Sequence, residues 1–210
     1  YKMDSYKIVL SPHIDDEVLG CGGILDENTF VIYCGSDESY KKDPWVKERP
    51  KKEDRMLELN SVVSLTNHSY KILDNKVNHY KLQDLISSFE KYINDYKPSE
   101  IYIPHPSYNQ DHRVVYDAAM TALRPHDVNH FVKRIFMYEQ PHMLFWDDKD
   151  FKPNYFVPID IEDKITSYKF LKSQVRGHRS PEMLRLIARM RGVQGNFENA
   201  EAFQILRWVD

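Results

Sequence analysis

The sequence contains no long hydrophobic run, since none of its apolar stretches approaches the roughly 18 consecutive residues that a membrane-spanning helix needs. It also has no surplus of positive charge: 29 Lys and Arg face 32 Asp and Glu, which gives a formal net charge of −3. Proteins that bind phosphate backbones usually cluster surplus Lys and Arg. We therefore expect neither a membrane nor a nucleic acid as a partner. The first ten residues lack the apolar run of a signal peptide, so a cytoplasmic location is expected.

Cysteine is equally scarce. Cys21 and Cys34 are the only two, too few for a four-cysteine zinc cluster, and we expect both to be small, partly buried thiols. A metal site in this protein would therefore have to use other side chains. The length of 210 residues fits one domain, and we expect a single domain over residues 1–210. A homo-oligomer is compatible with this composition but is not required by it.

Short β-branched runs alternate with helical patterns in the first half of the chain, which is typical of a parallel sheet flanked by helices. The expected strands cover residues 6–10, 30–34, 70–73 and 100–104. The expected helices between them cover residues 51–65 and 80–96, where apolar residues recur at helical spacing. This alternation predicts a Rossmann-like, three-layer α/β/α fold with a mostly parallel sheet.

The second half is expected to add further helices and strands to this sheet. Helices are predicted at residues 111–123, 161–176 and 181–190, and strands at residues 132–139 and 154–160. The segment 35–50 follows a strand end and lacks apolar periodicity, which is typical of a loop that contacts ligands. We expect substrate specificity to reside in this loop and in the aromatic stretch after Glu139.

The most informative segment is the run IVLSPHIDDEVLGCGG, in which an apolar strand leads directly into ionisable residues. His13 and Asp16 lie three residues apart at a strand-to-helix turn, so their side chains can converge on one ion. One imidazole and one carboxylate are suitable zinc ligands, but an open catalytic site needs a third protein ligand and a water molecule. The segment therefore predicts two of three ligands.

His112 is the candidate for the third ligand. It follows the strand predicted at residues 100–104 and stands where the next helix begins, so it would reach the same sheet edge. Zinc lowers the pKa of a bound water toward about 7. Asp15, adjacent to a ligand yet free of the metal, is placed to accept the water proton and to protonate the leaving amine later. Fe²⁺ would also suit two histidines and one carboxylate.

Helix capping offers a simpler explanation for each cluster by itself. Acidic residues at a helix start are favoured by the helix dipole and by capping, with no chemistry required. The pair Asp111 and His112 could likewise be a capped helix start. The combination favours a metal site, because both acid–histidine clusters follow predicted strands of one sheet.

These motifs resemble those of the LmbE-like, or PIG-L-type, zinc-dependent N-deacetylase family. The first family motif reads His-Pro-Asp-Asp-Glu after the first strand, and this chain has Ile14 in place of the proline. The second motif ends in Asp-His, matched by Asp111 and His112, with Asn109 where the family commonly has a further histidine. Weaker similarity continues at residues 173–178, 191–192 and 200–203, so the resemblance spans nearly the whole chain.

The resemblance implies an enzyme that removes the N-acetyl group from an N-acetylglucosamine-type sugar or sugar conjugate, releasing acetate and a free amine. It implies the metal ligands His13, Asp16 and His112. Asp15 is then the base, and Asp111 tunes the site.

Further residues are candidates for substrate binding. These are Arg49, Asn109 and His178. Many relatives carry a tyrosine that helps to hold the oxyanion where this chain has Asn199, so the oxyanion donor is left open.

Three alternatives remain at this point. A metal-dependent amidase could act on another N-acyl compound, such as an acylated antibiotic or an N-acyl amino acid. A metal-binding module without turnover would have no use for the unligated Asp15. A nucleotide-binding Rossmann protein would need a Gly-x-Gly-x-x-Gly turn after the first strand, where this chain has an acidic turn that repels pyrophosphate.

Overall fold

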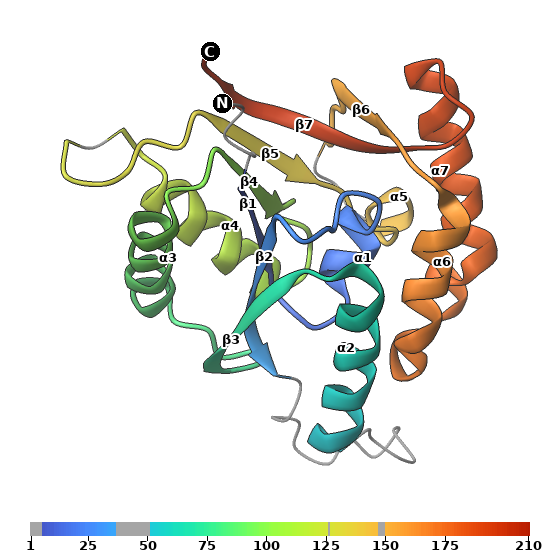
Figure 1. Ribbon diagram of the computed structural model, residues 1–210, viewed down its shortest axis with the longest axis horizontal. Coiled ribbons are helices and arrows are strands. Elements are labelled where there is room, and N and C mark those ends of the chain that lie inside the picture. Colours follow the sequence, from blue (N-terminus) through green and yellow to red (C-terminus); the bar gives the residue numbers. More distant parts are fainter. Residues whose placement is uncertain (1–5, 37–50, 126, 147–149) are drawn as a thin grey trace.

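A single mixed sheet organises the chain (Figure 1). The computed structural model describes residues 6–36, 51–125, 127–146 and 150–210. Within them, seven strands form the sheet in the order β3-β2-β1-β4-β5-β7-β6. Their bounds are β1 Lys7–Ser11, β2 Thr29–Ser36, β3 Ser69–Lys76, β4 Glu100–Pro104, β5 Arg134–Tyr138, β6 Tyr155–Pro158 and β7 Ala200–Trp208. All neighbouring pairs from β3 to β5 are parallel, whereas β7 runs antiparallel to both β5 and β6.

Helices cover both faces of the sheet. Their bounds are α1 Asp16–Cys21, α2 Lys52–Thr66, α3 Leu82–Tyr96, α4 Gln110–Ala122, α5 Met143–Trp146, α6 Ile161–Phe170 and α7 Pro181–Gly195. One apolar core joins α3 and α4 to one face, and a second joins α1, α2, α6 and α7 to the other. In the described residues, no helix is long and apolar enough to cross a membrane. The sheet order and the helices on both of its faces confirm the expected three-layer α/β/α fold with a mostly parallel sheet.

The connections that follow β1 and β4 leave the sheet on opposite faces. After β1 the chain enters α1, whose Val18 packs in the same core as Val9. After β4, the neighbour of β1, the chain enters α4 on the opposite face, where Val115 packs with Ile8. Open α/β sheets bind ligands outside the carboxyl ends of the strands where successive connections diverge to opposite faces. The carboxyl ends of β1 and β4 meet this description.

Two parts of the C-terminal region differ from the sequence-based expectation. The helix predicted at 161–176 ends at Phe170 and is followed by short 3₁₀ turns η1 Lys172–Gln174 and η2 Gly177–Arg179. The chain leaves the helix because tertiary contacts replace helical ones: the Ser173 N–H donates to Glu58 Oε1 of α2 at 2.8 Å. Strand β7 was not expected, since it begins with Ala and Glu, which have low strand propensity, and it depends on pairing with β5.

Candidate metal centre and active site

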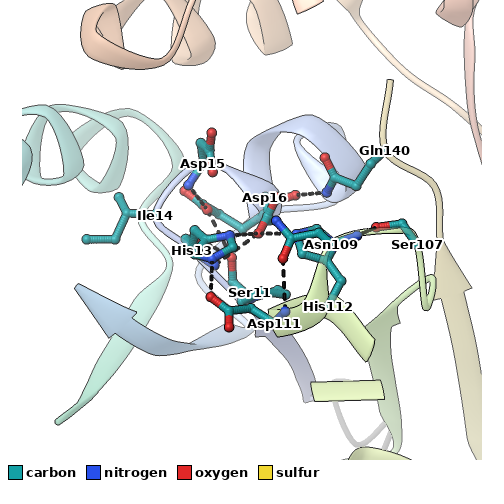
Figure 2. A network of polar contacts seen from close by, with 12 residues as sticks. Ser11, His13, Ile14, Asp15, Asp16, Ser107, Asn109, Asp111, His112 and Gln140 are labelled. Carbon is teal, nitrogen blue, oxygen red and sulfur yellow. Dashed lines mark hydrogen bonds and ion pairs between the residues drawn. The ribbon is translucent and has the colours of Figure 1, made fainter. Parts of the chain in front are cut away.

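Three predicted ligands come together at the carboxyl ends of β1 and β4 (Figure 2). His13 lies in the turn after β1, Asp16 begins α1, and His112 lies in the first turn of α4. Each offers one ligand atom, and these atoms lie within 4.8 Å of one another. Asp16 Oδ2 is 3.2 Å from His13 Nδ1 and 3.2 Å from His112 Nε2. Two imidazole nitrogens and one carboxylate oxygen beside an open pocket fit a catalytic zinc or iron ion.

The turn that carries His13 and Asp16 is held by hydrogen bonds between its backbone and side chains. The His13 N–H donates to Asp16 Oδ2 at 2.9 Å, which closes the turn. Ile14, which stands where the family has proline, is fully buried, and its carbonyl accepts a hydrogen bond from the Arg55 guanidinium. Burial and this hydrogen bond therefore fix a turn that lacks the rigidity of proline.

A second carboxylate orients the His13 ring. His13 Nε2 lies 3.0 Å from Asp111 Oδ2, so Nδ1 faces Asp16. Asp111 Oδ2 also accepts the Asn78 N–H at 2.8 Å. Burial lowers the pKa of His13, but the contacts with Asp111 and Asp16 outweigh it and raise the pKa well above its ordinary value. Carboxylate contacts of this kind fix the tautomer and orientation of a ligating histidine.

The three consecutive acids of the turn occupy different environments. Burial raises the pKa of Asp16, but His112 and His13 outweigh it and hold the pKa well below its usual range. Burial raises the pKa of Asp15 above its ordinary value, and the neighbouring Arg179 guanidinium offsets only part of this shift. Burial raises the pKa of Glu17 to about 8.

Capping does not account for these side chains. The Asp15 side chain makes no capping hydrogen bond to α1. At α4 the cap is Asn109, whose side chain accepts from the Asp111 N–H at 2.9 Å, and this leaves the Asp111 carboxylate for His13. The geometry therefore favours the metal-site interpretation over the capping one.

A pocket of about 220 Å³ opens beside the three ligands. Every described residue that lines it is polar, charged or aromatic: His13, Asp15, Asp16, Tyr108, Asn109, His112, His142, Gln174, His178 and Arg179. Two candidates for substrate binding, Asn109 and His178, thus lie in its wall, while Arg49 lies outside the described residues. Asn199 does not line this pocket but a separate surface depression with Ile161.

His142 and Arg179 are among the pocket residues that sequence reasoning missed. The His142 ring centroid lies 5.7 Å from that of His112 and 4.9 Å from that of Tyr108. It follows β5, the parallel neighbour of β4, and a histidine just after a central parallel strand was the available signal. Arg179 donates to Asp15 Oδ2 at 2.8 Å, and no motif in the sequence marks it.

Comparisons with known proteins place the chain in a family. The family model described as PIG-L, GlcNAc-PI de-N-acetylase, matches residues 8–123, more than half of the chain, which includes all three predicted ligands. The chain belongs to the PIG-L family, and the resemblance noted in the sequence is confirmed. No curated protein sequence matches the chain.

Solved structures share the fold over almost the whole chain. The conserved protein TT1542 from Thermus thermophilus has 19% identity and a TM-score of 0.78, covering 98% of this chain and 96% of its own. The N,N'-diacetylchitobiose deacetylase from Pyrococcus horikoshii has 18% identity and a TM-score of 0.75, covering 97% and 85%. The 4-carboxy-2-hydroxymuconate hydratase from Pseudomonas putida has 18% identity and a TM-score of 0.75, covering 97% and 98%. A deacetylase and a hydratase thus share this fold, so the fold does not decide the reaction.

Proposed function

We propose that the protein is a zinc-dependent N-deacetylase that hydrolyses the acetamide of an N-acetylglucosamine-type sugar or sugar conjugate, releasing acetate and a free amine. The observation that carries the proposal is the combination of three convergent ligands with Asp15, a carboxylate beside them that belongs to the pocket wall but not to the ligand set. Membership of the PIG-L family supports deacetylation as the reaction.

The metal is proposed from the donor set. His13, Asp16 and His112 would hold it, and a bound zinc ion supplies a water of lowered pKa and polarises a carbonyl oxygen. Asp111 keeps the His13 ring in place through its contact with Nε2. Fe²⁺ suits the same donors, and metal analysis of the purified protein distinguishes the two ions.

Asp15 is the proposed proton carrier. Its carboxylate points away from the three ligands in Figure 2 and lines the pocket. It would take a proton from the attacking water and return it to the nitrogen of the leaving amine, so that one residue serves as base and then as acid. His142, Asn109 and His178 lie in the same pocket, where they could donate hydrogen bonds to the carbonyl oxygen or to sugar hydroxyls.

The pocket lining supports a polar substrate. Among the residues that the structure describes, no aliphatic side chain lines the pocket, and those that do offer donors and acceptors that match hydroxyl groups. Tyr108 is half exposed beside His142 and provides an aromatic surface at the rim. An acylated antibiotic or an N-acyl amino acid would use the same chemistry, and identification of the released products separates these substrates from a sugar.

The proposal is tested by metal analysis together with acetate release from N-acetylglucosamine and N,N'-diacetylchitobiose. We expect one metal ion per chain, and a loss of about 10²–10⁴ in kcat for Asp15→Asn with unchanged metal content. Asp84→Asn makes the same substitution at an exposed position of α3 and should have wild-type activity.

Each component of the proposal can fail separately. Absence of metal binding contradicts the metal site. Metal binding without turnover of any probe contradicts the sugar substrate. A protein that binds metal, turns over no probe and is unaffected by Asp15→Asn is a binding module rather than an enzyme.

A further inference from the structure

Arg179 reaches the pocket from a part of the chain that the family model does not match. It ends η2, whereas the match covers residues 8–123. Its Nη1 donates to Asp15 Oδ2 at 2.8 Å, and the two side chains are 20% and 4% exposed. The contact is therefore a largely buried ion pair between a pocket arginine and the proposed base. Such a charge-assisted hydrogen bond is stronger and more directional than a contact between exposed side chains.

The Arg179 guanidinium is itself held by a second hydrogen bond, to Gln174. Its Nη2 donates to Gln174 Oε1 at 3.2 Å, and Gln174 is buried. The Gln174 carbonyl accepts a hydrogen bond from the Tyr168 hydroxyl at 3.0 Å, and Gln174 Nε2 donates to Ser173 Oγ at 3.0 Å. A continuous set of hydrogen bonds thus links α6 and η1 to Arg179 and fixes the orientation of its guanidinium group.

Asp15 needs such a partner because of its neighbours. Asp15 and Asp16 follow one another in sequence, and both are buried. Like charges this close repel each other in a poorly solvated site. A carboxylate without a counter-charge on the side away from Asp16 would rotate toward solvent, and Arg179 supplies that counter-charge.

We propose that Arg179 positions Asp15 for proton transfer by holding Oδ2, so that Oδ1 faces the reacting water. The hydrogen bond from the guanidinium engages Oδ2, which leaves the other carboxylate oxygen available to a water in the pocket. The inference rests on the proposed function, because it assigns Arg179 a role through Asp15. Arg179 is a positioning residue for the base.

The test compares Arg179→Ala with Arg176→Ala. Both remove one positive charge from the same short segment, but Arg176 is exposed and donates to the carbonyls of Ser173 and Val175. Crystal structures of both zinc-loaded variants show where the Asp15 carboxylate lies, and this measurement needs no substrate. We expect it to be displaced in Arg179→Ala and unchanged in Arg176→Ala. An Asp15 carboxylate that keeps its place in Arg179→Ala overturns the proposal.

Kinetics give a second readout. A misplacement of about 1 Å in a catalytic group costs about 100-fold in rate. We expect kcat for acetate release to fall about 100-fold in Arg179→Ala, with unchanged affinity for zinc, and to stay within about 2-fold of wild type in Arg176→Ala. Added guanidinium should restore part of the lost rate, whereas urea, which has the same shape but no charge, should not. Failure of guanidinium to restore activity contradicts a positioning role.

A double variant separates this inference from the proposed function. If Arg179 acts through Asp15, Arg179→Ala should cause no further loss in an Asp15→Asn background. Loss of activity in Asp15→Asn together with full activity in Arg179→Ala leaves the proposed function intact and overturns the role of Arg179. Full acetate release by Asp15→Asn contradicts the role of Asp15 as the base while leaving deacetylation itself intact. The position of the Asp15 carboxylate in the crystals then still decides whether Arg179 holds it.

Discussion

The two parts of the chain contribute to the candidate site in different ways. The part matched by the family model supplies all three proposed ligands and Asp15. The part after residue 132 supplies none of these, but its side chains hold the turn after β1 and the helix α1 that continues it. Gln140 donates to the Asp16 carbonyl at 3.1 Å, and Lys164 donates to the Leu19 carbonyl at 2.8 Å.

The second part holds the turn through charged residues in the interior. Lys164 pairs with Glu201 at 2.6 Å, and the same glutamate oxygen accepts the Gly23 N–H at 3.0 Å, just after α1. Arg191 forms a bidentate pair with Glu139, which precedes Gln140. The comparison teaches that most of the residues placed to perform the chemistry, His13, Asp15 and Asp16, lie within one short turn, whereas the residues that hold them are scattered along the chain.

The largest expected effect tests the part that supplies the ligands. His112→Ala removes one of three donors, so we expect the protein to lose stoichiometric metal after dialysis and acetate release to fall to background. His130→Ala, in the loop between α4 and β5, is the matched control and should retain metal. Retention of tightly bound metal by His112→Ala would show that this part does not hold the ion as proposed.

The next effect tests the part that holds the turn. Lys164→Met leaves Glu201 buried without its cation, and we expect the free energy of unfolding at neutral pH to fall by about 3–5 kcal/mol. Lys91→Met breaks an exposed pair with Asp95, which water and salt screen, and should leave the free energy of unfolding almost unchanged. Denaturant unfolding of both variants measures the difference, and equal losses would contradict a special role for the buried pair.

The same variant has an expected pH dependence. Burial raises the pKa of Glu201, and Lys164 opposes this, so loss of the lysine raises the pKa further. A group whose folded pKa is raised favours the folded state below its unfolded pKa and loses that contribution as the pH rises through the folded pKa. The deficit of Lys164→Met should therefore shrink toward acid pH and be largest above the raised pKa.

A smaller effect is expected at the contact between Asp111 and His13. Asp111→Asn removes the charge that faces His13 Nε2, and we expect the affinity for zinc to fall about 10–100-fold without loss of the fold. Asp117→Asn, exposed on the same helix, controls for the substitution. Competition with a chelator measures both affinities, and an unchanged affinity in Asp111→Asn would place Asp111 outside the metal site.

The smallest effect concerns the loop after β3. Asn78 has φ 64° and donates its N–H to Asp111 Oδ2 at 2.8 Å. A β-branched residue is strained at this φ, so Asn78→Val should shift the loop and weaken zinc binding a few-fold, whereas Asn78→Gly should not. Asn196→Val introduces the same strain at the C-cap of α7, where φ is 60°. A similar loss of zinc affinity in both valine variants would attribute it to general instability.

The parallel strands and the convergence of His13, Asp16 and His112 could be predicted because each signal is local. Each strand is a short apolar run, and His13 and Asp16 follow one such run directly. Local patterns could not predict the contacts that hold the turn, because Arg179 lies 164 residues from Asp15 and Lys164 lies 145 residues from Leu19. The break after Phe170 and strand β7 were missed for the same reason, since contacts with α2 and β5 determine them.

The bond between Gly23 and Glu201 spans 178 positions, and this separation has a consequence for synthesis on the ribosome. The acidic turn is synthesised early, but the hydrogen bond from Gly23 cannot form until Glu201 of β7 has been synthesised. Contacts at such separation form late, since closing a long loop costs entropy before the contact is gained. A nascent chain that already carries all three ligands would thus be a poor competitor for metal, and its affinity would rise only once the last strand enters the sheet.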